Sequence, residues 1–360
     1  MKGTLWSPMY LRGVQLPNRA VLAPMSQYMA TDGQPTLWHY THYHQRALAC
    51  GLVIVEATAV SPQSRITEHD LGLWDNRCMT GLGHIAAVIS AAGAVPGLQI
   101  SHGGRKSGRT RPWEGDRPAI GACPEGPSPI PFAEGYPKPH ALSGTEIENT
   151  VADFVAVTKR AANAGFRVLE LHAGHGRLLH SFYSPIANHR TDSYGGRWLN
   201  RVRLLVDTVD AVREVWPIES PLLVRLSCVD WVPGGWELND SVRLARILKL
   251  HGVDLIDCTS GGIMRPITVP VAPGYQVPFS AEIRKKARIA TAAVGAISTV
   301  SQAEEILARD QADLVLFGRA ALLDPFLPLR ASVPEHVPPP YQRGRTHLAM
   351  TNTLDHIPEL

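Results

Sequence analysis

Residues 144–172 read GTEIENTVADFVAVTKRAANAGFRVLELH and contain the repeating unit that decides the fold. The first part, Gly144–Ala164, carries apolar residues at three- and four-residue spacing, which is typical of an amphipathic helix. Ser143 precedes this segment as a helix-capping residue, and Gly165 follows it as a helix terminator. The β-branched apolar run Val168–His172 then predicts a buried strand. The stretch is therefore expected to form one helix followed by one strand.

Seven further apolar runs of the same kind occur along the chain, and helix-length segments such as Gly196–Val215, Asn239–His251 and Thr299–Arg309 separate them. Eight strands that alternate with helices favour a parallel sheet closed into a (β/α)8 TIM barrel over an open doubly wound sheet. No GxGxxG pattern follows the first run, so the dinucleotide-binding fingerprint is absent there. The expected strands are Ala20–Pro24, Leu52–Val55, Gly97–Ser101, Val168–His172, Leu222–Ser227, Asp254–Cys258, Ile289–Gly295 and Asp313–Gly318.

The domain organisation predicted from these runs is a single barrel over residues 1–330 and a C-terminal tail over 331–360. After the third strand, residues 103–143 contain eight prolines and seven glycines in 41 residues. Long loops of this kind are usually lids or binding loops, and an idle surface connector is the alternative. The tail contains Pro338–Pro340, so it cannot be a core helix and is expected on the surface or against a neighbouring subunit.

Composition excludes several classes of function. With 44% hydrophobic and 19% charged residues, the chain is expected to bury a large core. The net charge is +3 and no Lys/Arg run occurs, so we expect neither nucleic acid nor a membrane surface as a partner. No apolar segment suits a membrane span or a signal peptide. Five cysteines without a CxxC pattern argue against disulfides and zinc, and a cytoplasmic location is expected. The expected partner is a small-molecule substrate.

Two histidines, His172 and His175, close the fourth strand, at the end of the barrel where active sites are built. They suit a pair of metal ligands, but no third ligand accompanies them, and no metal is expected. They also suit ordinary core histidines. The third interpretation, which we favour, is a pair of hydrogen-bond donors that converge on one substrate oxygen.

Glycines follow the last two strands, as Gly295 and as Gly318 beside Arg319. Bare backbone N–H groups can close on an anion and the arginine supplies charge, so this arrangement suits a phosphate site in a barrel. The alternative is that the glycines merely end their strands.

A combination of motifs over nearly the whole chain resembles the Old Yellow Enzyme family. Within that family, Tyr28, the stretch Pro112–Asp116 and the tail segment Tyr341–Gly344 resemble the bacterial xenobiotic-reductase or thermophilic-like branch. The motifs that carry the family resemblance are Pro17–Arg19, Ala23–Met25, Leu52–Ala59, Gln99–Lys106, His172–Gly176, Asn188–Gly196, Asp254–Ser260 and Phe317–Arg319.

The resemblance implies an enzyme that binds FMN, takes electrons from NADPH or NADH, and reduces activated C=C bonds in enones and nitroalkenes by ping-pong hydride transfer. Tyr28, His172 and His175 would face the substrate. Arg343 would reach into a partner subunit's site, which implies a homodimer or homotetramer. The residues implied to bind the cofactor, together with the phosphate-site glycine, are Ala23, Pro24, Met25, Ser26, Ala57, Gln99, Arg225, Gly295, Gly318 and Arg319.

Among these residues, Gln99 offers an amide that matches the flavin pyrimidine edge, and Arg225 can stabilise the negative charge of reduced flavin. Two positions depart from the branch. Ser26 stands where the branch usually has a cysteine, and Arg177 stands where the family usually has a proton-donating tyrosine. A guanidinium with a pKa above about 12 is a poor general acid. If it points to the pocket rim, Arg177 favours an anionic group on the substrate; a solvated surface arginine is the alternative.

Three functions remain open at this point. The favoured one is an ene-reductase that takes its proton from water or from a hydroxyl such as that of Tyr28 or Tyr183. The second is an oxidative tailoring enzyme of the same family, a desaturase or demethylase, in which no carbon is protonated. The third is a flavin-free barrel that acts as a lyase or binds an anion through Arg177.

Overall fold

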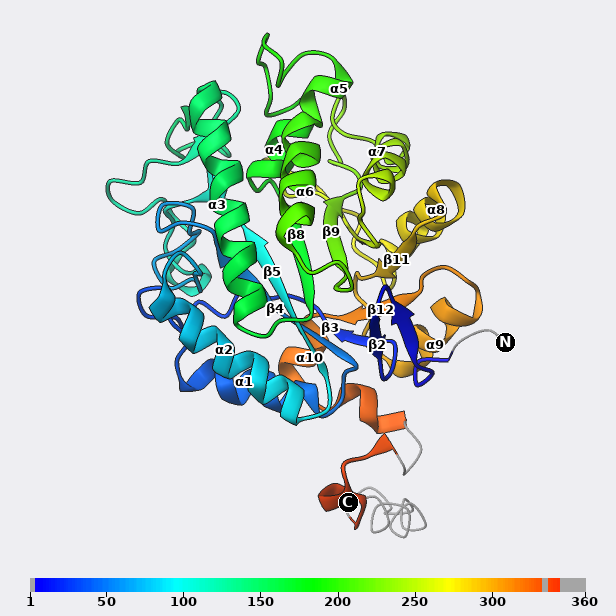
Figure 1. Ribbon diagram of the computed structural model, residues 1–360. Helices are drawn as coiled ribbons and strands as arrows, with labels where there is room; N and C mark the ends of the chain where they lie inside the picture. Colours follow the sequence, from blue (N-terminus) through cyan, green and yellow to red (C-terminus); the bar gives the residue numbers. More distant parts are fainter. Residues whose placement is uncertain (1–3, 332–335, 344–360) are drawn as a thin grey trace, which may run out of the picture.

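The computed structural model describes residues 4–331 and 336–343 and contains a closed barrel of parallel strands surrounded by helices (Figure 1). All eight expected strands are present, so the predicted (β/α)8 barrel is confirmed. Because β12 pairs with β3, the sheet has no free edge. In pairing order, the strands are β3 (Ala20–Leu22), β4 (Leu52–Ala59), β5 (Val95–Ser101), β8 (Val168–Ala173), β9 (Leu222–Ser227), β10 (Leu255–Thr259), β11 (Ala290–Ala293) and β12 (Leu314–Phe317).

The helices pack around the barrel and begin and end close to their predicted limits, with one exception. The predicted helix Gly196–Val215 is two helices, α5 and α6, separated at Val202. The capping prediction at Ser143 is confirmed, since its side chain accepts a hydrogen bond from the backbone of Glu146. The helices are α1 (Leu37–Ala47), α2 (Asn76–Ala91), α3 (Gly144–Asn163), α4 (Leu178–Tyr183), α5 (Trp198–Arg201), α6 (Arg203–Val215), α7 (Leu238–Leu250), α8 (Val277–Ala287), α9 (Val300–Ala308) and α10 (Arg319–Leu323).

A hairpin that the sequence analysis did not predict closes the N-terminal end of the barrel. Its strands, β1 (Met9–Leu11) and β2 (Val14–Leu16), pair antiparallel. Leu11 and Leu16 belong to the same apolar cluster as inward-facing barrel residues such as Leu52. Strands of three residues are too short to show a clear alternation, which is why the sequence pattern did not reveal them. The hairpin thus adds apolar side chains to the core at this end of the barrel.

Residues 103–143 form a folded loop that is tied to the barrel. His102 Nε2 lies 3.0 Å from the carboxylate of Glu125, and the Nη1 of Arg190 donates a hydrogen bond to the carbonyl of Pro127. These residues connect β5 to α3, and their action as a lid-like insertion stays a prediction. Its elements are η1 (Gly104–Lys106), η2 (Pro112–Glu114), β6 (Glu125–Gly126) and β7 (His140–Ala141).

The described part of the tail lies beside the N-terminal segment and the end of the barrel chain. His336 stacks on Trp6 with ring centroids 4.8 Å apart, and Tyr341 meets Phe326 edge to face at 5.8 Å. Arg343 is exposed, and its predicted place in a partner subunit's site stays a prediction. Within the two described ranges, no helix combines the length and apolar character needed to cross a membrane.

Candidate active site

The C-terminal ends of the strands surround a cavity of about 710 Å³. This volume lies within the range of roughly 300–1,000 Å³ that is usual for ligand and cofactor sites. Most of the cofactor-binding residues expected from the sequence line it, and one histidine of the substrate pair joins them. These residues are Ala23, Pro24, Met25, His175, Arg225, Gly295, Gly318 and Arg319.

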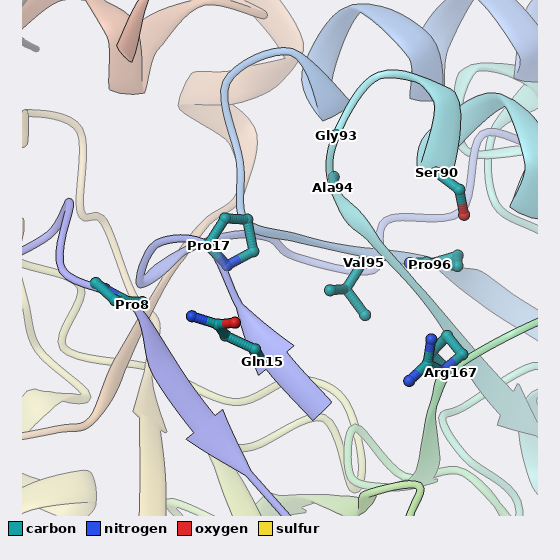
Figure 2. A pocket seen from close by; sticks show the side chains of 9 residues that line it. All are labelled: Pro8, Gln15, Pro17, Ser90, Gly93, Ala94, Val95, Pro96 and Arg167. Atoms are coloured by element: carbon teal, nitrogen blue, oxygen red, sulfur yellow. The ribbon is translucent and has the colours of Figure 1, made fainter. Parts of the chain in front are cut away.

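A second cavity, of about 610 Å³, lies at the other end of the barrel (Figure 2). Gln15 of the hairpin, Val95 at the start of β5 and Arg167 just before β8 line it. In (β/α)8 enzymes this end of the barrel serves stability, whereas catalysis takes place at the C-terminal ends of the strands. We therefore place the candidate active site in the first cavity.

The phosphate end of the site follows β11 and β12. Gly295 has a φ of +122°, a conformation that favours glycine. A Cβ atom added there would lie 2.8 Å from the Nε2 of Gln276, so a side chain would also be crowded. Gly318 and Arg319 line the same cavity after β12. Backbone without side chains beside an arginine is an arrangement that holds a phosphate.

A network of buried polar residues lies beneath the cavity, on adjacent strands. Gln99 on β5 donates from its Nε2 to Glu170 on β8 at 2.7 Å. Arg225 on β9 lies 3.1 Å from Asp257 on β10, close enough for an ion pair, although the atoms are not aligned for a hydrogen bond. Burial, reinforced by the charge of Asp257, raises the pKa of Glu170. The network fixes Gln99 and Arg225 in the barrel wall.

The histidine pair is brought together at the end of β8. The Nε2 of His172 lies 3.4 Å from the Nδ1 of His175, and the rings are perpendicular. The backbone N–H of Gly174 donates to the Nδ1 of His172, so the proton of the neutral His172 ring is on Nε2. Thr259 lies 2.9 Å from the Nε2 of His175. The Thr259 hydroxyl can also donate to the Oε1 of Gln276 at 3.3 Å, an oxygen that Ser260 already contacts at 2.6 Å. When Thr259 donates to His175 instead, both facing nitrogens carry protons and can bind one oxygen.

Burial lowers the pKa of both His172 and His175 well below the usual range, and the neighbouring cations act in the same direction. Both rings are therefore neutral at pH 7. A neutral imidazole donates one hydrogen bond from a nitrogen whose position is set by the partner of the other nitrogen. The pair is thus a source of hydrogen bonds rather than of charge.

The backbone around His175 is held on both sides. Its φ is +53°, an unfavourable value for a residue with a side chain. Its N–H donates to the Oγ of Ser227 at 2.8 Å, and its carbonyl accepts a hydrogen bond from the Nζ of Lys106 at 2.7 Å. Gly176 must be glycine, because a Cβ atom there would lie 2.2 Å from the carbonyl oxygen of Gly262. These contacts hold a strained loop in the conformation that the pair requires.

Of the two tyrosines considered as proton donors, only Tyr28 has a suitable position. It lies on the loop after β3, has a φ of +54° and meets Trp113 of the insertion edge to face at 5.9 Å. Burial raises its pKa, so its phenol keeps the proton at neutral pH. Tyr183 is fully buried, and its hydroxyl donates to the carbonyls of Ala173 and Ser227. It is therefore a structural residue, and the suggestion that it supplies a proton is wrong.

Arg177 is not the solvated surface arginine of the alternative interpretation. It precedes α4, and its Nε and Nη1 are shielded from solvent. The largest charge interactions of its guanidinium are with Tyr28, Asp70 and Arg109. The side chain therefore lies on the Tyr28 side of the site, two residues beyond His175.

Several predicted residues lie beside the cavity rather than in its lining. Ala57 and His172 are buried in the barrel wall, and Ser26 lies next to Met25 on the loop after β3. Other lining residues were not predicted. Thr259 is the last residue of β10. A polar residue at the C-terminal end of a barrel strand is a signal from which the sequence could have predicted its place in the site. The remaining unpredicted residues come from loops without a local signal and include Pro273, Tyr275, Gln276, Ala296 and Ser298.

These residues fit FMN. The phosphate would be held by Gly295, Gly318 and Arg319, and the ring end would lie against Met25 and Arg225. Arg225 lines the cavity, and its Nε lies 3.1 Å from the carboxylate of Asp257 without the alignment of a hydrogen bond. A buried guanidinium nitrogen without an acceptor is costly, and a flavin oxygen or nitrogen would supply one.

Comparisons with known proteins show the family of this chain. The model of the NADH:flavin oxidoreductase / NADH oxidase family matches residues 4–335. The NADPH dehydrogenase of Geobacillus thermodenitrificans is 44% identical over 351 residues, which is 96% of this chain and 99% of the relative. The NADPH dehydrogenase of Bacillus subtilis is 41% identical over 96% of this chain and 100% of its own length. Morphinone reductase superposes with a TM-score of 0.78 at 29% identity, covering 92% and 89% of the two chains.

The family model covers most of the chain, and the curated relatives align along almost their whole length. With a cavity that fits FMN at the expected end of the barrel, the chain belongs to the NADH:flavin oxidoreductase / NADH oxidase family, of the Old Yellow Enzyme kind, and is an FMN-dependent oxidoreductase with a nicotinamide reductant.

Proposed function

We propose that this flavoenzyme reduces activated C=C bonds in enones and nitroalkenes, with both half reactions in one pocket. The observation that carries the proposal is the convergence of His172 Nε2 and His175 Nδ1, 3.4 Å apart, beside the cavity that fits FMN. Two neutral N–H donors suit the oxygen of a carbonyl or nitro group, where negative charge develops as hydride arrives at the alkene.

FMN, when bound, accepts hydride from NADPH or NADH and supplies it to the alkene. The chain contributes orientation and electrostatics. His172 and His175 hold the substrate oxygen and fix the distance and angle of the alkene, and such orientation supplies a large part of the rate. Lys106 and Ser227 hold the loop of His175 and so keep the two donors in register.

The proton for the second alkene carbon comes from water or from Tyr28. The Tyr28 phenol is protonated at neutral pH, because burial raises its pKa. Arg177 occupies the position of the usual donor and holds its proton too tightly to transfer it efficiently. The protonation step is therefore expected to limit turnover with neutral enones.

Arg177 also supports a second candidate, a desaturase or demethylase that passes hydride from substrate to flavin. That direction needs no carbon protonation, so the absence of a good general acid would not slow the reaction. The flavin-free lyase or anion-binding protein is set aside by the family match.

An anaerobic titration tests the proposed direction. The yellow protein should lose its flavin absorbance when NADPH is added and regain it when 2-cyclohexenone or 1-nitrocyclohexene follows. Recovery with neither alkene, together with bleaching of the oxidised flavin by a saturated ketone, would favour the oxidative candidate instead.

A further inference from the structure

Arg177 carries a charge that the described protein does not neutralise. Across residues 4–331 and 336–343, its Nε and Nη1 find no hydrogen-bond acceptor, and both atoms are shielded from solvent. A guanidinium cannot escape this situation by losing its proton, because its pKa stays high even when buried. Leaving such donors unpaired is costly, so the position is suited to an acceptor that a ligand brings.

The two carboxylates near Arg177 are already engaged elsewhere. Asp70 accepts hydrogen bonds from the backbone of Ile66 at 2.8 Å and from the hydroxyl of Thr67 at 2.8 Å. Asp116 forms ion pairs with Arg109 and with Arg265. Neither carboxylate forms an ion pair with Arg177 in the described part of the chain.

Further cations surround Arg177. Lys106 is buried, and its Nζ lies 4.1 Å from the centre of the Phe132 ring. Burial and the charges of Arg177 and Arg109 lower the pKa of Lys106 well below its usual range. Arg109 is buried as well, and its Nε also lacks an acceptor among the described residues. Because Asp116 pairs with Arg109, Arg177 is a cation on this side of the site whose shielded Nε and Nη1 no carboxylate of the described residues contacts.

This cationic cluster, defined as Arg177 and Arg109, lies beside the histidine pair. Lys106 donates to the carbonyl of His175, and Arg177 follows His175 by two residues. The charge of Arg177 acts on both imidazoles and is the largest charge acting on Tyr28. An anion bound to Arg177 would thus lie within one small molecule's length of an oxygen held by the histidines.

We propose that the cationic cluster is an anion subsite and that the substrate is an activated alkene carrying a carboxylate, which Arg177 binds while His172 and His175 hold the carbonyl or nitro oxygen. The inference rests on the proposed function and names its substrate class. A carboxylate can accept two parallel hydrogen bonds from one guanidinium, which also orients the molecule. The phosphates of NADPH offer similar chemistry, so the test must separate the two.

The binding arm uses oxidised, FMN-loaded protein and two ligands of nearly equal shape, 4-hydroxybenzoate and 4-hydroxybenzamide, with flavin absorbance as the readout. The parent should bind 4-hydroxybenzoate more tightly than 4-hydroxybenzamide. In Arg177→Gln this preference, measured as the ratio of the two dissociation constants, should fall by about ten-fold or more, as expected for the loss of a charged hydrogen bond. Arg177→Lys should retain part of the preference. Arg117→Gln, which removes an exposed arginine of the insertion over residues 103–143, should leave it unchanged.

The kinetic arm compares (E)-4-oxopent-2-enoate with its methyl ester. Arg177→Gln should lower kcat/KM for the acid by about ten-fold or more relative to the ester. An unchanged acid-to-ester ratio and an unchanged ligand ratio would overturn the anion subsite. So would a variant whose only defect is weaker NADPH binding, because Arg177 would then hold a phosphate of the reductant. If NADPH reduces the flavin but neither alkene reoxidises it, the proposed function fails, and the ligand titration still decides the subsite.

Discussion

The Nε2 of His172 faces the Nδ1 of His175 across 3.4 Å, and the other nitrogen of each ring has a polar partner in the protein. Gly174 fixes the proton of His172 on the facing nitrogen. Thr259 does the same for His175 when its hydroxyl donates to the Nε2 of that ring rather than to Gln276. The protein therefore determines where the two donors point before any ligand arrives, which reduces the cost of ordering them on binding.

The first prediction concerns this pair. Oxidised protein should bind 4-hydroxybenzaldehyde as the phenolate and show a long-wavelength charge-transfer band. His172→Ala or His175→Ala should weaken binding by on the order of 1.5–3 kcal/mol, the value of a charged hydrogen bond. Absorbance titration measures the effect. Unchanged affinity in both variants would mean that the phenolate oxygen binds elsewhere.

Thr259 provides a second prediction. Thr259→Val removes the only hydroxyl that contacts the Nε2 of His175 in the described structure, so the protein no longer directs the His175 proton to Nδ1. Phenolate binding should weaken several-fold, and ¹⁵N NMR of His175 should show a changed tautomer. Thr259→Ser keeps the hydroxyl and should behave as the parent. If Val and Ser variants give the same NMR spectrum as the parent, Thr259 does not set the tautomer.

The phosphate end gives a third prediction. Arg319→Gln should weaken FMN binding by roughly ten-fold, because one charged contact to the phosphate is lost. Riboflavin, which has no phosphate, should bind the parent and the variant equally. Arg309 is an exposed arginine that directly follows α9, and Arg309→Gln serves as the control for net charge. Equal losses for FMN and riboflavin would place Arg319 against another part of the cofactor.

The fourth prediction is a pH dependence of stability. Glu56 is fully buried, accepts hydrogen bonds from the backbone of Gln27 and the hydroxyl of Tyr43, and burial raises its pKa to about 8. A carboxyl group that binds its proton more tightly in the folded state destabilises the fold progressively as pH rises from its unfolded pKa, about 4.5, to about 8.

Glu56→Gln has no such proton to lose, so its free energy of unfolding should fall less than that of the parent between about pH 5 and about pH 8. Urea unfolding of both proteins across this range measures the difference. Parallel curves for parent and variant would show that Glu56 ionises in the fold as easily as in the unfolded chain.

The sequence predicts the barrel well because each strand is a self-contained signal. An apolar β-branched run such as Leu52–Val55 is buried on both faces, and eight apolar runs leave little choice of architecture. The split of the predicted helix at Val202 and the three-residue hairpin strands around Leu11 and Leu16 escaped prediction, because their patterns are too short to differ from a loop or a continuous helix.

The candidate site could be predicted only in part. His175 and Arg319 follow strands and Arg225 lies in the second half of β9, so the fold alone brings them to one cavity. Gln276 comes from the loop before α8 and Lys106 from the insertion, and their roles depend on tertiary contacts that no local pattern encodes. Sequence reasoning also placed Tyr183 beside the chemistry, whereas its hydroxyl is bonded to two backbone carbonyls in the core.

The central claim is that the histidine pair presents an alkene for reduction, and one stopped-flow measurement tests it most directly. Parent protein and the His172→Ala/His175→Ala double variant, both loaded with FMN and reduced by dithionite, are mixed anaerobically with 1-nitrocyclohexene. The account predicts saturable reoxidation of the parent and a rate slower by about 100-fold or more in the double variant, from the loss of two oxyanion donors. Equal reoxidation rates, or a parent that the nitroalkene does not reoxidise, would contradict it.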